Sequence, residues 1–407
     1  DGAEAQRWIA IPGDGQARLA NDSKASAVFP DGTVLVKQLN LPGVNGNSSV
    51  RLETQILHFE DGTWRPYSYR WDDAGVDAIL VDGAVGASRP LRLGPKNDPT
   101  GALAETYDRT WHVNATNECK LCHNAGAKFV LGFVPQQLDR ALAGSTDGAG
   151  NGAGGQLAAL AGRGIIAAAP QLAADDPLRL VDPHDAAGSL DDRARSYLHV
   201  NCSMCHHLGG NAIVSFYLRR DMPFEKLNTY KGTGIGTFGL RDAKLIVPGD
   251  PYRSVLMYRM SKLGYARMPY IGSRVVDGAG VALIEQWIRG MTPKAGDVLS
   301  GPATSGSDDA VAVAALSAKS DQPQDRREAA VARLLKSTEG SLALIAQLHR
   351  GSLSRQDASA AVIFASRVGS TDIRGLFDTF IPESQRRPTL GPKIDPQVVL
   401  SRTGDVQ

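Results

Sequence analysis

The four cysteines of this 407-residue chain occur in two short motifs of the same form, Cys-x-x-Cys-His. The first reads CKLCH over residues 119–123, and the second reads CSMCH over residues 202–206. In this pattern each thiol forms a thioether with one haem vinyl group, and the histidine lies under the iron as proximal ligand. We therefore predict two covalently attached c-type haems. Their attachment residues would be Cys119, Cys122, Cys202 and Cys205, and their proximal ligands His123 and His206.

Other uses of paired cysteines are open. The two pairs of a four-cysteine zinc site usually lie about 15–20 residues apart, whereas 79 residues separate Cys122 from Cys202. Disulfide frameworks are typical of smaller secreted domains that lack a sufficient core. A thioredoxin-like motif is expected once, in a β-α-β context. The histidine that follows both pairs favours haem over these alternatives.

A methionine downstream of the second motif is a candidate sixth ligand for the second haem. Met268 precedes a proline in the sequence LGYARMPYIGS and follows His206 by 62 residues. This segment resembles the methionine loop of class I cytochromes c, which presents a thioether sulfur to the iron. His199 and His207 are the alternatives and would give two histidine ligands. A His/Met pair gives a higher reduction potential than two histidines.

Residues 186–297 predict a small helical domain around this haem. Ser189, with Asp192 three residues later, predicts a helix start before the second motif. The sequence PGDPYRSVLMYRMSK predicts a short middle helix, and Asp277 caps a last helix. One face of that last helix is apolar, formed by Val281, Ile284, Trp287 and Ile288. The arrangement resembles the class I cytochrome c fold, in which the first and last helices cross over one haem edge.

The first haem lacks a comparable ligand, because no methionine lies between Cys122 and Cys202. His112 and His58 are its candidate sixth ligands, and an iron with an open or unusual sixth position is the alternative. Residues 1–185 predict a β-rich domain that carries this haem and the helices after it. The runs FPDGTVLVKQLNL, VRLETQILHF and GTWRPYSYRW are typical of strands and predict a β-meander over roughly residues 6–110.

A meander that ends in a haem motif resembles cytochrome P460, and the phrase FPDGTVLVK carries this resemblance. It implies a five-coordinate haem that oxidises small nitrogen compounds. The lysine that crosslinks to the porphyrin in that family is not identifiable in this sequence.

The C-terminal third predicts helices after a linker. Residues 298–325 are rich in Ser, Ala, Gly and Asp and predict the linker. Residues 326–407 predict a helical, repeat-like segment, in which Ser354 and Asp357 form a capping box, followed by a connector. That connector resembles the one preceding a further cytochrome c domain in large multi-module cytochromes. The glycine-rich residues 144–155 predict a flexible surface loop. The expected fold class is therefore multidomain α+β.

Several segments in a fixed order carry a resemblance over about residues 7–290. They include RWIAIPGDG, FPDGTVLVK, ECKLCHNAGAKFVLGF, YLHVNCSMCHH, VPGDPYRSVLMYRM and RMPYIGSRVVD. These resemble a family of bacterial dihaem c-type cytochrome modules, often fused or adjacent to quinoprotein sugar-dehydrogenase-like β-propellers. The resemblance implies electron transfer to and from redox partner proteins, such as a dehydrogenase, other cytochromes or further domains of the same polypeptide. A haem enzyme with an open first iron is the alternative.

The composition adds limits. With 44 basic and 43 acidic residues the chain is nearly neutral, which gives no indication of nucleic acid as a partner. No apolar run approaches the roughly 20 residues that span a bilayer. The chain begins at Asp1 without an apolar leader, which we interpret as a removed signal peptide or a longer parent protein. Because the thioethers are made outside the cytoplasmic membrane, we expect a periplasmic or extracellular protein.

Overall fold

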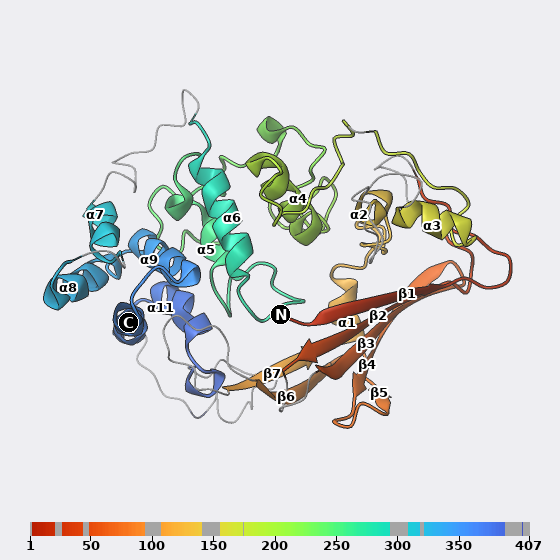
Figure 1. Ribbon diagram of the computed structural model, residues 1–407, viewed down its shortest axis with the longest axis horizontal. Helices are drawn as coiled ribbons and strands as arrows, with labels where there is room; N and C mark the ends of the chain where they lie inside the picture. Colours follow the sequence, from red (N-terminus) through yellow and green to blue (C-terminus); the bar gives the residue numbers. More distant parts are fainter. Residues whose placement is uncertain are drawn as a thin grey trace.

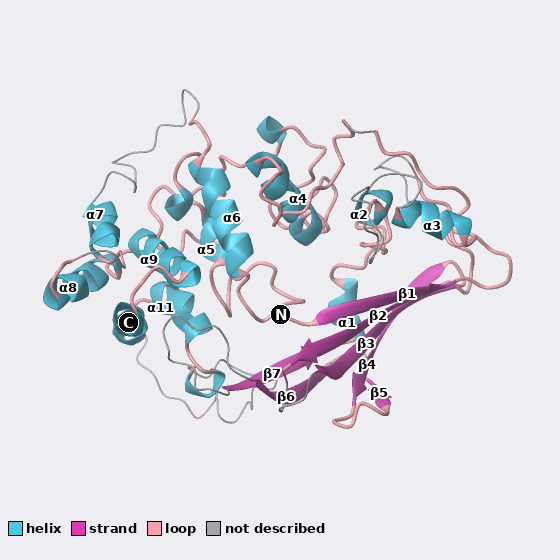
Figure 2. Ribbon diagram, in the orientation of Figure 1, coloured by secondary structure: helices cyan, strands magenta, loops and turns pink. Residues whose placement is uncertain are grey.

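The structure, a computed structural model, has a mixed α+β architecture in which an N-terminal antiparallel sheet precedes a large helical part (Figures 1 and 2). It describes residues 2–20, 27–43, 49–93, 107–140, 155–173, 175–293, 308–317, 321–386 and 401. The predicted glycine-rich loop lies outside these residues, except for Gly155 at its end.

The predicted β-meander is confirmed. Five strands pair in sequence order, each antiparallel to the next. Asp61 and Gly62 join the third strand to the fourth with φ of 52° and 70°, values that Asp-Gly hairpin turns require. The strands are β1 (Glu4–Ala10), β2 (Val34–Pro42), β3 (Ser49–Glu60), β4 (Thr63–Trp71) and β5 (Ala78–Leu80).

One face of this sheet, here called the inner face, is covered at both ends. At one end, Leu39, Leu41 and Leu52 pack against a second hairpin, formed by β6 (Ala87–Leu93) and β7 (Tyr107–Val113). At the other end, Leu35, Leu57 and Phe59 pack with Phe129, Val130 and Leu157. These last residues belong to the segment of three short helices, α1 (Thr116–Lys120), α2 (Pro135–Leu138) and α3 (Gln156–Gly162). The inner face therefore lies under the first Cys-x-x-Cys-His motif.

The second motif is carried by a helical region centred on α4 (Leu190–Cys202), α5 (Val255–Met260) and α6 (Gly278–Arg289). The predicted caps are confirmed, since Ser189 accepts a hydrogen bond from the Asp192 N–H and Asp277 accepts one from the Gly280 N–H. The predicted apolar face of α6 is buried. Helices α4 and α6 pack together, and the Trp287 indole donates to Asp191 over 2.8 Å.

The C-terminal helices share a core with this region rather than forming a separate one. They are α7 (Asp308–Ala315), α8 (Gln324–Leu334), α9 (Thr338–Arg350), α10 (Arg355–Arg367) and α11 (Thr371–Phe377). Their core cluster includes Phe238, Tyr252 and Tyr258. The buried Glu285 of α6 accepts hydrogen bonds from Tyr252 (2.8 Å) and from Arg350 of α9 (2.5 Å), which ties the two parts together. The Ser354 cap of α10 is confirmed.

The segment predicted as a linker differs from expectation, because it contains α7. Alanine and valine dominate this helix, and alanine is the best helix former. The buried Arg327 of α8 donates to the carbonyl groups of Ala315 and Leu316 at the end of α7, and it also binds Asp357. These tertiary contacts stabilise a helix that the local sequence only weakly predicts.

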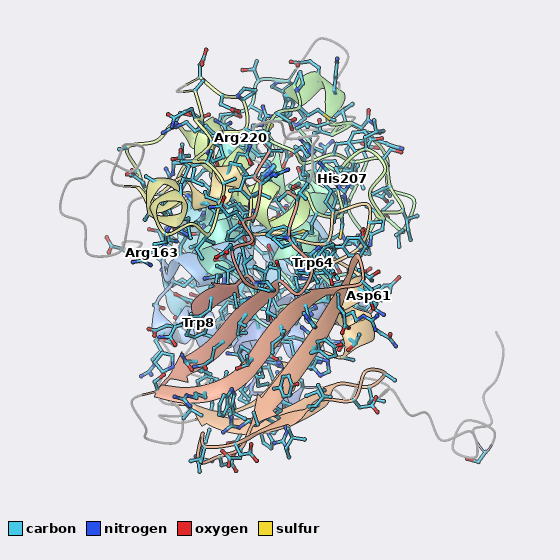
Figure 3. All side chains as sticks on the ribbon, turned by 90° about the vertical axis from the view of Figure 1, so that its right-hand side faces the viewer. Trp8, Asp61, Trp64, Arg163, His207 and Arg220 are labelled. Atoms are coloured by element: carbon cyan, nitrogen blue, oxygen red, sulfur yellow. The ribbon has the colours of Figure 1, made fainter. Side chains whose placement is uncertain are left out.

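Figure 3 shows the layer of side chains that fills the space between the sheet and the helices, with Trp64 on the sheet side and His207 and Arg220 on the helical side. Among the described residues, no helix combines the length and apolar character needed to cross a bilayer.

Candidate functional site

The two Cys-x-x-Cys-His motifs adopt the same backbone turn. In the first, the N–H groups of Cys122 and His123 donate to the Cys119 carbonyl over 3.1 and 2.9 Å. In the second, Cys205 and His206 donate to the Cys202 carbonyl over the same two distances, 3.1 and 2.9 Å. Each turn follows directly from a helix, α1 or α4, that ends at or just after the first cysteine. Two sequences that are far apart therefore build one local geometry.

Both motif histidines are oriented in the same way. The Nδ1 atom of His123 lies 2.6 Å from the Phe129 carbonyl oxygen, and that of His206 lies 3.1 Å from the Phe216 carbonyl oxygen. A carbonyl acceptor fixes the proton on Nδ1 and leaves Nε2 with a free lone pair, which is how metal-binding histidines are usually held. Burial lowers the pKa of both imidazoles, which favours the neutral, ligating form.

The two motifs meet in space although 79 residues separate them. The thiols of Cys122 and Cys205 lie close enough to influence each other, and this interaction lowers the pKa of Cys205 to about 7 and raises that of Cys122. Asn211 donates to the Leu121 carbonyl over 2.6 Å, and His207 Nε2 lies 3.0 Å from the Gly126 carbonyl oxygen. The second cysteines of the two motifs are thus the closest points of the two sites.

The predicted methionine loop lies beside the second motif. The Met268 N–H donates to the Arg259 carbonyl over 2.9 Å, and the Arg259 side chain donates to the Ala266 carbonyl over 2.9 Å. The Arg259 charge contributes to the lowered pKa of His206, after burial and against the Phe216 hydrogen bond. Burial raises the pKa of the Tyr270 hydroxyl, two residues after Met268, and the nearby Cys205 thiol adds to this effect. The structure therefore brings together the second motif and the Met268 loop.

The two alternative ligands of the second site make other contacts. His199 accepts a hydrogen bond from the Arg220 N–H over 3.2 Å, and burial lowers its pKa to about 4. His207 has both ring nitrogens next to carbonyl oxygens, those of Ser203 and Gly126. Met268 is thus the candidate with the fewest competing contacts.

The first motif rests on a polar patch of the inner face that sequence reasoning missed. Four neighbouring strands place Arg7, Lys37, Gln55 and Ser68 in one row. Glu53 lies beside this row on β3 and is 2% exposed. Apolar clusters flank the patch on both sides. We call Lys37, Glu53, Gln55 and Ser68 the polar patch; its signal in the sequence is the interruption of two apolar strands by Lys37 and Glu53.

The patch interacts with the first motif. The buried Ser68 hydroxyl approaches the Cys119 thiol without forming a hydrogen bond of normal geometry. Burial raises the pKa of Cys119, and the charge of Glu53 adds to this effect. Lys37 contributes to the lowered pKa of His123, behind burial. The first motif thus has charged side chains of the sheet on one side.

The two histidines predicted as sixth ligands of the first haem lie in different places. His112 Nε2 is 2.7 Å from Glu118 Oε2, in an ion pair that is part of the start of α1. His58 shares the outer face of β3 with Thr54 and Ile56, because side chains alternate along a strand and Leu57 and Phe59 face inward. His112 thus lies beside the first motif but binds Glu118, and the ligand role of both histidines stays a prediction.

The donor set fits two separate haem sites better than a single metal-ion site. All four cysteines are free thiols. Within the described ranges no three His, Cys, Asp or Glu side chains converge as a metal-ion site. Large apolar side chains are left exposed around the motifs and the methionine loop, as expected of residues that a porphyrin covers. They are Leu121, Leu208, Ile213, Tyr265 and Tyr270.

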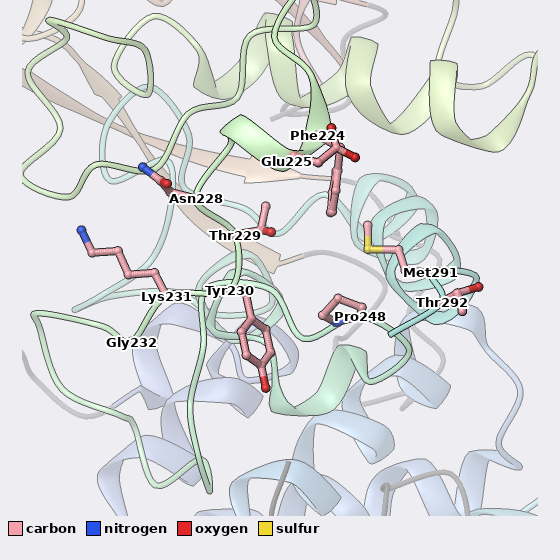
Figure 4. A pocket seen from close by; sticks show the side chains of 10 residues that line it. All are labelled: Phe224, Glu225, Asn228, Thr229, Tyr230, Lys231, Gly232, Pro248, Met291 and Thr292. Atoms are coloured by element: carbon pink, nitrogen blue, oxygen red, sulfur yellow. The ribbon is translucent and has the colours of Figure 1, made fainter. Parts of the chain in front are cut away.

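A cavity of about 600 Å³ lies apart from these sites (Figure 4). Phe224, Tyr230, Pro248 and Met291 are among its lining residues, and none of the predicted site residues lines it.

No protein-family model, curated protein or solved structure matches the chain.

Proposed function

We propose that this protein is an extracytoplasmic dihaem c-type cytochrome that passes electrons from a donor to an acceptor. Cys119 and Cys122 would hold one haem, and Cys202 and Cys205 the other, with His123 and His206 as proximal ligands. Covalent haem would supply an iron that takes up and releases one electron. The donor would be a dehydrogenase, for which a quinoprotein is our first candidate, or another cytochrome.

The single observation that carries this proposal is the contact of two equal turns at Cys122 and Cys205. Each turn presents a neutral histidine with a free Nε2, and the second cysteines adjoin. Two haems attached at adjoining thiols would lie near each other, as an electron relay requires. The chain's own residues hold the relay rigid, because the Asn211 and His207 hydrogen bonds join the motifs directly.

In this proposal the second haem lies in a class I cytochrome c-like region, residues 186–297. The packing of α4 on α6, the middle helix α5 and the Met268 loop beside the second motif support this part. Met268 would be the sixth ligand, and its thioether would raise the potential of the second haem.

The test is chemical and spectroscopic. The purified protein should retain its colour in acidified acetone, and its intact mass should exceed that of the polypeptide by two haems. Its oxidised spectrum should show the weak long-wavelength band of sulfur–iron ligation. A bare polypeptide would contradict the proposal, and the alternative of zinc held by the four cysteines would then be tested by metal analysis.

A haem enzyme is the second candidate function. The observation that favours it is the surroundings of the first motif, where the buried Glu53 and Ser68 lie beside Cys119 and the candidate ligand His112 binds Glu118. An iron with an open sixth position next to polar side chains binds small molecules, whereas a saturated iron transfers electrons only.

A further inference from the structure

We infer that the polar patch on the inner face of the sheet is a binding site for a small polar molecule at the first haem. Lys37 and Glu53 would be the residues that hold it. This inference rests on the proposed covalent haem at the first motif, and it goes further by naming the site and its ligand class. The ligand would be a small molecule that accepts one hydrogen bond and donates another.

The first step is the geometry of the sheet. In the antiparallel register Lys37 pairs with Gln55, and Gln55 pairs with Ser68, so these three side chains point to one face. A β-bulge next to the Leu39–Glu53 pair inserts one extra residue into β3. The extra residue allows Leu52 and Glu53, although adjacent in sequence, both to lie on the inner face. Without the bulge, one of the two would point outward.

The second step is that the patch has hydrogen-bonding capacity that the protein does not use. Glu53 Oε1 accepts a hydrogen bond from Gln55 over 2.9 Å, but Glu53 Oε2 and the Ser68 hydroxyl are buried without a hydrogen-bond partner. Within the described part of the chain, Lys37 forms no ion pair, and Glu53 influences it only at longer range. Buried polar groups are nearly always satisfied, so unsatisfied ones that adjoin a cofactor motif indicate a ligand.

The third step is the position of the patch. Ser68 lies at the Cys119 thiol, and Lys37 and Glu53 influence His123 and Cys119 electrostatically. Helix α1, which carries Cys119, packs against β4, the strand that carries Ser68 (Figure 1). The second motif differs, because its first cysteine, Cys202, packs against an apolar cluster and the charge that acts on its histidine is that of Arg259. The proposed site is therefore assigned to the first haem.

The ligand class follows from the donors and acceptors present. The ammonium group of Lys37 has only donors, so it binds an acceptor atom or a negative charge. The carboxyl group of Glu53 accepts a hydrogen bond through Oε2 when it is ionised. A pair of this kind suits a small weak acid, whose anion Lys37 stabilises while Glu53 takes the proton. Hydrogen cyanide is such an acid and is also a strong iron ligand, which makes it a suitable probe.

The experiment is an optical titration of the oxidised holoprotein with cyanide. One of the two haems should bind it, and that binding should be absent from the double variant C119A/C122A, which keeps only the second haem. Lys37→Gln should weaken cyanide binding about tenfold, as expected for the loss of a hydrogen bond to a charged group. Glu53→Gln should slow binding, because the group that takes the proton is removed.

Lys120→Gln is the matched control, since Lys120 is exposed on α1 next to Cys119 and should leave the affinity within about twofold. Circular dichroism would check that each variant is folded. If a variant is not folded, Ser68→Ala replaces it and should also weaken cyanide binding. This inference would be overturned if Lys37→Gln bound cyanide as tightly as wild type. It would also be overturned if the protein carried two covalent haems and neither bound cyanide. Both results would leave the proposed function intact. A protein without covalent haem would contradict the proposed function itself.

Discussion

The two halves of the site share one backbone turn and differ in almost everything around it. The first motif rests on a sheet, with the buried Glu53 and the half-buried Lys37 beneath it. The second lies among helices in an apolar cluster, beside the Met268 loop. In the proposed cytochrome the motif would determine how each haem is attached, and the surrounding elements would determine what its iron does. We expect a saturated iron at the second site and an open one at the first.

The largest expected effect separates the two haems completely. C119A/C122A and C202A/C205A should each halve the haem content, because thioethers form only at paired thiols. The haem that remains in C119A/C122A should keep the sulfur–iron band, and the haem in C202A/C205A should lack it. Pyridine haemochrome assays and oxidised optical spectra measure both quantities. A sulfur–iron band in C202A/C205A would reverse the assignment of Met268.

The next effect concerns the potential of the second haem. Met268→Ala should lower it by on the order of 0.2 V and leave the first potential unchanged, because a thioether ligand favours ferrous iron. A spectroscopic redox titration resolves the two haems. Met260→Leu, a change in α5 close to the same core, is the control and should leave both potentials in place. If the two variants behave alike, Met268 is not a ligand.

A third effect sharpens the contrast in polarity. Burial raises the pKa of Glu53 from 4.5 to about 7, so the folded protein retains a proton that the unfolded chain has lost in this range. Stability from this group is therefore lost as the pH rises from about 4.5 to about 7. Glu53→Gln should be more stable than wild type at pH 8, by up to about 3 kcal/mol, and nearly equal at pH 4.5.

Denaturant unfolding of both proteins at the two pH values measures this difference. Glu60→Gln, at the exposed end of the same strand, is the control and should show little dependence on pH. A difference between Glu53→Gln and wild type that is the same at both pH values would indicate a packing effect instead of an ionisation effect.

The smallest effect tests the contact between the two halves. Asn211→Ala removes the hydrogen bond to the Leu121 carbonyl and should cost about 1 kcal/mol in the free energy of unfolding. It should also slow electron exchange between the haems, which flash photolysis of the partly reduced protein measures. Asn201→Ala is the control, since its amide bonds only within α4, to the Tyr197 carbonyl. Equal exchange rates in the two variants would show that the contact does not set the spacing.

Local signals predicted several parts of the fold correctly. The β-meander follows from runs of β-branched and aromatic residues with turns between them, and the caps at Ser189, Asp277 and Ser354 follow from residue type and spacing. The local sequence does not predict helix α7, because the contacts that stabilise it come from Arg327 of another helix. The core that α5 shares with the C-terminal helices is also not predictable locally, because its residues are far apart in the sequence.

By itself, the sequence determined the two paired-thiol motifs, their histidines and the methionine loop, because these depend on residues a few positions apart. Only the tertiary structure decided that Cys122 adjoins Cys205, that His58 lies on the outer face of the sheet, and that Lys37 and Glu53 lie beneath the first motif. These relations depend on strand register, on one β-bulge and on the docking of helices onto a sheet. Such long-range packing leaves no local pattern in the chain.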